Sequence, residues 1–75
     1  MKRFWATAVL DPKRPHKLAG QITDEILSHL LDQSGAKVKV SFEIEAECPD
    51  GIDDPTVRTI RENCNTLGIE DFGLE

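Results

Sequence analysis

The clearest pattern in the chain is a strict alternation of polar and apolar residues from Lys37 to Glu47. A period of two is typical of a β-strand, in which successive side chains point to opposite faces. The apolar positions are Val38, Val40, Phe42, Ile44 and Ala46, and the polar positions are Lys37, Lys39, Ser41, Glu43, Glu45 and Glu47. Because a strand buried on both faces would be apolar almost throughout, this alternation predicts a sheet that is covered on one side only.

Two further segments favour strands on weaker grounds. Arg3 to Leu10 combines aromatic, β-branched and small residues, and it stops at Asp11-Pro12, where proline lacks the amide that a sheet needs. Ile69 to Leu74 is the third predicted strand. Alternation along the first segment would place Trp5 and Val9 on the open face of the sheet.

A helical period follows the first predicted strand. Pro15 has the fixed backbone angle that suits a first helical position, so we expect a helix from near His16, ended by Ser34-Gly35, where glycine can adopt the left-handed conformation. Its apolar stripe comprises Leu18, Ile22, Ile26 and Leu30, widened by Ala19, Leu27 and Leu31.

A second helix is predicted after a turn at Pro49-Asp50-Gly51. Asp53-Asp54-Pro55 offers a capping carboxylate followed by proline at the start of the helix, and Gly68 is a natural terminator. The buried stripe would comprise Val57, Ile60, Cys64 and Leu67.

The resulting order is β-α-β-α-β. If the strands lie in the order 1-2-3, which the sequence does not fix, right-handed crossovers predict an α/β two-layer sandwich, in which a three-stranded sheet carries both helices on one face. The 75 residues suffice for a single small domain spanning 1–75. A core of this size rarely supplies more than about 3 to 5 kcal/mol, so we expect a second copy or a larger partner to contribute to stability.

The net charge of −5 is unevenly distributed. Residues 1–20 hold five cations against Asp11, whereas residues 43–75 hold ten acids against Arg58 and Arg61. This asymmetry indicates either attraction between the two ends, within the fold or between copies, or nucleic-acid binding by the basic end. The acidic net charge favours attraction between the ends, because it repels phosphate.

Candidate chemical sites are few. His16, His29, Cys48 and Cys64 lack the spacing of a metal site, and we interpret both cysteines as reduced thiols in small buried positions. We find no catalytic motif, so the sequence predicts a protein that is not an enzyme and has no catalytic, cofactor-binding or metal residues. Without a membrane span or a signal peptide, it is expected in the cytoplasm.

Three groups of residues are candidates for interaction. Trp5 and Val9 would form a contact patch on the open sheet face. Arg58 and Arg61 could hold a phosphate or a partner's carboxylate, although pairing with Glu62 or the strand glutamates is the commoner arrangement. The candidates for nucleic-acid contact are Lys13, Arg14 and Lys17.

Several stretches also resemble a known family: Arg3-Phe4 through Leu10-Asp11-Pro12, Arg14-Pro15, Val38 to Glu47, Asp50-Gly51, Val57-Arg58-Thr59-Ile60, Glu62-Asn63 and Thr66-Leu67. They resemble the C-terminal segment of large predicted prokaryotic ATPases that carry a domain of unknown function and often lie in phage-defence loci. The resemblance implies an accessory module whose partner is the large ATPase. The family's ATP-binding motifs lie elsewhere in those chains, so it implies no ATP-binding residue here.

The sequence therefore predicts a non-catalytic interaction module that associates with itself, as a dimer, or docks with a larger ATPase. The surfaces expected to do so are the open sheet face, an edge strand or the arginine face of the second helix. The alternative is a weak nucleic-acid-binding module that uses the basic segment Lys13-Lys17.

Overall fold

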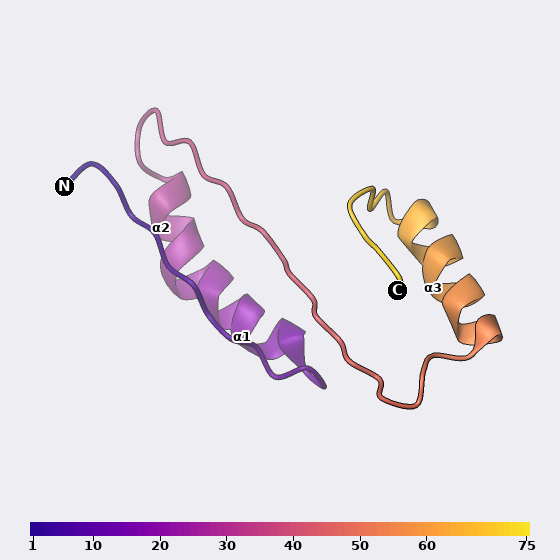
Figure 1. The fold of residues 1–75 in the computed structure, drawn as a ribbon. Coiled ribbons are helices and arrows are strands. Elements are labelled where there is room, and N and C mark those ends of the chain that lie inside the picture. Colours follow the sequence, from indigo (N-terminus) through magenta and orange to yellow (C-terminus); the bar gives the residue numbers. More distant parts are fainter. The chain divides into compact units, whose positions relative to one another are not determined.

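The computed structural model describes residues 1–75 and divides them into two units, Met1–Phe42 and Glu43–Glu75, each of which contains one helical region (Figure 1). The elements in order are α1 (Pro15–Ile22), the π-helical turn η1 (Thr23–Leu27), α2 (Ser28–Leu31) and α3 (Asp54–Thr66). The first three follow one another without a break and form one helix. No residue belongs to a β-strand.

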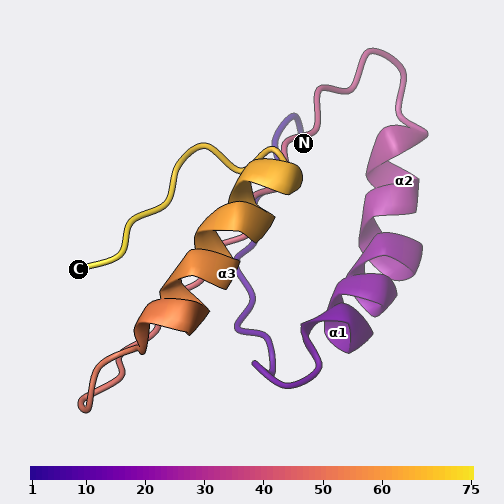
Figure 2. The ribbon, with the colours of Figure 1, turned by 90° about the vertical axis from the view of Figure 1, so that its right-hand side faces the viewer.

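Both predicted helices are confirmed. The first begins at Pro15 and ends at Leu31, a few residues before the predicted terminator. Gly35 nevertheless adopts the left-handed conformation expected of it, with φ of 72°. The chain reverses direction in the turn before Pro15, so the first helix runs antiparallel to residues 1–10 (Figures 1 and 2).

The π-helical turn keeps the half-buried residues of the first helix on one face. The half-buried residues of this helix beyond its first turn are Ala19, Ile22, Leu27 and Leu30, spaced three, five and three apart. A step of five leaves the face of an α-helix, but the wider turn produced by i to i+5 hydrogen bonds returns the side chain toward that face. Thr23 Oγ1 donates to the Ala19 carbonyl at 2.8 Å and Ser28 Oγ to the Asp24 carbonyl at 2.7 Å.

Helix α3 has well-formed ends. The Asp53 carboxylate accepts a hydrogen bond from the Thr56 amide at 3.1 Å, and Pro55 lies in the first turn, as predicted. At the other end the Ile69 amide donates to the Cys64 carbonyl at 2.9 Å while Gly68 has φ of 74°. This pairing is the Schellman arrangement, in which only glycine takes the left-handed position without strain.

The prediction of an α/β sandwich is wrong. The segments Arg3 to Leu10, Lys37 to Glu47 and Ile69 to Leu74 form no strands, and no sheet exists. Outside the helices, backbone hydrogen bonds join only residues close in sequence. An alternating pattern fixes which side chains share a face, but a strand forms only where a second strand completes its hydrogen bonds, and the chain supplies none.

The chain has no buried core. No residue is buried, and the accessible surface totals 7799 Å². Two separate compact bodies of the sizes of these units would together expose about 5,600 Å². The face predicted to be packed in the Lys37 to Glu47 segment is exposed, and so is Cys48. A large apolar area is therefore left uncovered.

The cap of α3 can be tested by replacing Asp53. We expect Asp53→Ala to destabilise this helix by about 1 kcal/mol, because the Thr56 amide loses its acceptor. Asp53→Asn should preserve the cap and serves as the matched control. Far-ultraviolet circular dichroism and amide exchange at residues 54–58 of the full chain measure the effect, and equal protection in the alanine and asparagine variants would contradict it.

Candidate functional site

The most prominent surface is the segment Lys37–Glu47, called here the alternating segment. Its Val40, Phe42 and Ile44 side chains are 69%, 63% and 79% exposed. None of its backbone amides or carbonyls has a hydrogen-bond partner in the protein. Figure 1 shows this segment running between α2 and α3 with no helical turn within it. The segment thus offers both apolar side chains and unpaired backbone groups.

The charges of the alternating segment are segregated along its length. Lys37 and Lys39 lie in its first part, while Glu43, Glu45 and Glu47 lie in its last part. All five are exposed. They occupy the polar positions of the alternation, so an extended backbone would present them on the face opposite Phe42 and its apolar neighbours.

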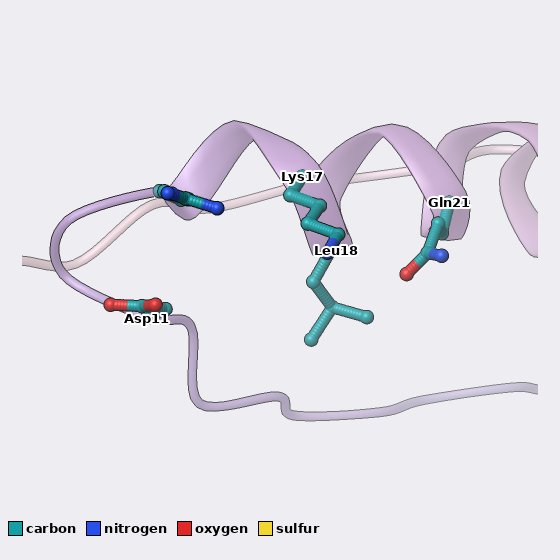
Figure 3. Close-up of a pocket in the computed structure, with 5 residues that line it drawn as sticks. Asp11, Lys17, Leu18 and Gln21 are labelled. Atoms are coloured by element: carbon teal, nitrogen blue, oxygen red, sulfur yellow. The ribbon is translucent and has the colours of Figure 1, made fainter.

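The basic candidates gather at the turn before the first helix. The Arg14 amide donates to the Asp11 carbonyl and the Lys13 amide to Asp11 Oδ1, both at 3.0 Å. Arg14, Lys17, Leu18 and Gln21 border a hollow together with Asp11, whose side chain lies within the turn (Figure 3). All three basic candidates are exposed, but the Asp11 carboxylate beside them offsets part of their charge.

Trp5 and Val9 are at the surface, 77% and 93% exposed. The Arg3 guanidinium carbon lies 5.8 Å from the centroid of the Trp5 ring, a cation–π contact worth about 0.5–1 kcal/mol at an exposed site. The sheet face that was predicted to join Trp5 and Val9 does not exist. They are exposed side chains on an extended segment rather than a formed patch.

The two arginines of α3 have different surroundings, although both are exposed. Arg61 borders a hollow of the second unit that also includes Glu47 and Glu75, with half-buried Val57 and Leu74 on its apolar side. Arg58 does not line it. The two arginines are three positions apart on α3 and are therefore neighbours on its surface, and Arg58 has Asp54 and Glu62 about one helical turn away on either side.

Both cysteines are free thiols. Cys64 is half-buried within the stripe of α3, as the helical spacing predicts, whereas Cys48 is exposed. No group of three or more histidine, cysteine, aspartate or glutamate side chains is arranged to hold a metal ion. None of the helices has both the length and the apolar composition needed to cross a membrane.

Comparison with known proteins gives no relative. No protein-family model, no curated protein sequence and no solved structure matches the chain. The resemblance to large predicted ATPases therefore stays a prediction from the sequence.

The sequence pattern identified the alternating segment, but the prediction of what surrounds its apolar face was wrong. Its apolar face was predicted to lie under helices, and only its polar face was expected to be open. The signal that could have revealed the exposure is the short chain length, because a small chain buries only a modest share of its surface. The segment as a whole is the feature that most needs a partner.

The exposure of Cys48 has a direct chemical test. In dilute solution, we expect iodoacetamide to modify Cys48 faster than Cys64, because the half-buried Cys64 lies within a helical stripe. Peptide mass spectrometry at increasing times would measure both rates, and Cys48→Ser should remove the fast phase. Slow modification of both cysteines would instead support the packed position that the alternation predicts for Cys48.

Proposed function

We propose that this chain is a non-catalytic interaction module that completes its fold by associating with a second copy of itself. The observation that carries the proposal is the lack of any buried residue in a chain that is 39% hydrophobic. The accessible surface of the chain exceeds the surface expected of two compact bodies by about 2,200 Å². Each partner in a standard protein interface buries about 800 Å², so the excess is more than sufficient for one.

Charge supports a second copy as the partner. Met1–Phe42 carries seven lysines and arginines against four acids, whereas Glu43–Glu75 carries two arginines against ten acids. Two copies thus contain surfaces of opposite sign, which attract each other and orient an encounter. Association of apolar surfaces then supplies the burial that the single chain lacks.

A larger ATPase is the alternative partner that the sequence resemblance implies. Such a partner would cover the same apolar surfaces, and the module would remain an accessory without catalytic residues of its own. The proposal places the module in the cytoplasm, as the sequence predicts.

The second candidate function is weak nucleic-acid binding. The observation in its favour is that Lys13, Arg14 and Lys17 are all exposed around one turn at the start of α1. Against it stand the acidic net charge and the Asp11 carboxylate on the same turn. Phosphate binding through a few cations would be strongly weakened by salt.

Retention on duplex DNA separates the two functions. We expect the chain to pass through a column of immobilised duplex DNA without retention at about 0.15 M salt. At this salt concentration, interactions between exposed charges are largely screened beyond about 8 Å. Retention that decreases with salt, and that is lost when Lys13, Arg14 and Lys17 are all replaced by glutamate, would favour nucleic-acid binding instead.

Self-association predicts that mass and stability depend on concentration. Light scattering after size-exclusion chromatography should give a mass above the 8.4 kDa of one chain, rising with concentration toward that of a dimer. The thermal midpoint should rise in parallel, because association stabilises the folded state by mass action. A mass of one chain at every concentration, with a constant midpoint, would overturn the proposal.

A further inference from the structure

We propose that two copies pair through their alternating segments, Lys37–Glu47, as antiparallel strands related by a two-fold axis at Phe42. This inference rests on the proposed self-association and names the surface that produces it. The unpaired backbone of the segment is what such pairing requires, since each strand would supply the hydrogen-bond partners that the other lacks. No strand within one chain is needed.

The charge pattern fixes the direction, and pairing of the whole segment fixes the register. With Phe42 opposite the partner's Phe42, Lys39 faces the partner's Glu45 and Lys37 faces the partner's Glu47. Each pair occurs twice, because the axis exchanges the two chains. Residues directly opposite each other in antiparallel strands have Cβ atoms about 4.5–5.5 Å apart, close enough for opposite charges to stabilise the pair.

The same register aligns the apolar face. Val38 lies opposite the partner's Ala46, and Val40 lies opposite the partner's Ile44. β-branched and aromatic cross-strand pairs of this kind are among those that stabilise a sheet. All the charged pairs then lie on one face of the two-stranded ribbon and all the apolar pairs on the other, because the side-chain period is two.

Other alignments are disfavoured. Parallel strands in register would place each lysine against the same lysine and each glutamate against the same glutamate, which is repulsive. A shift of one residue in the antiparallel pair would set apolar residues opposite polar ones and move them to different faces. A shift of two residues, with the axis at Ser41, keeps lysines opposite glutamates but places Ala46 and Glu47 beyond the end of the partner's segment. Only the register centred on Phe42 pairs the segment over its whole length.

A two-stranded ribbon by itself is only marginally stable in water. Its apolar face needs cover, and amphipathic helices are the usual means. Each chain has two amphipathic helical regions whose apolar residues are at most half-buried. Pairing would thus create a continuous apolar surface of the kind that such helices cover.

Single charge reversals test the register. We expect Lys39→Glu and Glu45→Lys each to weaken dimerisation of the full chain about tenfold or more, since each sets two like-charged pairs in place of two opposite ones. Glu45→Lys is the more informative variant, because it also lowers the net negative charge. Repulsion between whole chains would then decrease, and a pure net-charge effect would strengthen the dimer.

Combining the two reversals restores the pairs. An equimolar mixture of the Lys39→Glu and Glu45→Lys chains should form a heterodimer with nearly wild-type affinity, and the double variant should do so as a homodimer. Glu43→Lys is the matched control: it changes the net charge by the same amount, but residue 43 lies opposite the partner's Ser41. Its effect should be smaller than that of Glu45→Lys. Sedimentation equilibrium of each chain and of the mixture measures these affinities.

The outcomes separate this inference from the proposal on which it rests. A wild-type chain that stays a monomer at every concentration overturns the proposed self-association itself. A wild-type dimer that is unaffected by the reversals, or whose two reversed variants fail to restore each other on mixing, leaves self-association standing and overturns the antiparallel register.

Discussion

The uncovered apolar surface is the constraint on which the rest of this structure depends. Folding of a short chain must offset a large loss of conformational entropy through burial, and below about 80 residues a single core barely does so. Here the helices form but no residue becomes buried, so tertiary packing contributes little to either helix. Their stability has to come from caps and local hydrogen bonds until a partner covers their apolar stripes.

The features that could be predicted from the sequence are those set by neighbouring residues. The Asp53 cap, the left-handed glycines after each helix and the turn at Pro49-Asp50-Gly51 each depend on contacts within a few positions. The sheet could not be predicted in the same way, because its hydrogen bonds need a partner strand whose location the pattern does not specify. The π-helical turn was also missed, although a repeat of four in the apolar residues, longer than the α-helical 3.6, hints at a wider turn.

The candidate interaction residues show the same difference between features set by neighbouring residues and features that need long-range pairing. The exposure of Lys13, Arg14 and Lys17 follows from a polar turn and was foreseeable. Trp5 and Val9 are exposed as well, but their grouping depended on a sheet that does not form. Cys48 was placed on a packed face for the same reason. Residues whose position depends on long-range pairing were therefore the ones misplaced, whereas the helical position of Cys64 is correct.

The charge gradient of the alternating segment has a second consequence. An exposed segment with β-branched and aromatic residues at alternate positions is an aggregation hazard, because its unpaired backbone can add strands without limit. Many fibres stack identical segments in parallel register, and there the lysines would meet lysines and the glutamates would meet glutamates. The same charges become complementary once two strands run in opposite directions. Segregating the two signs at the ends of the segment thus disfavours the parallel stack while permitting a specific pair. An arrangement with like charges at paired positions, such as lysine at both 39 and 45, would repel in both directions and provide no such discrimination.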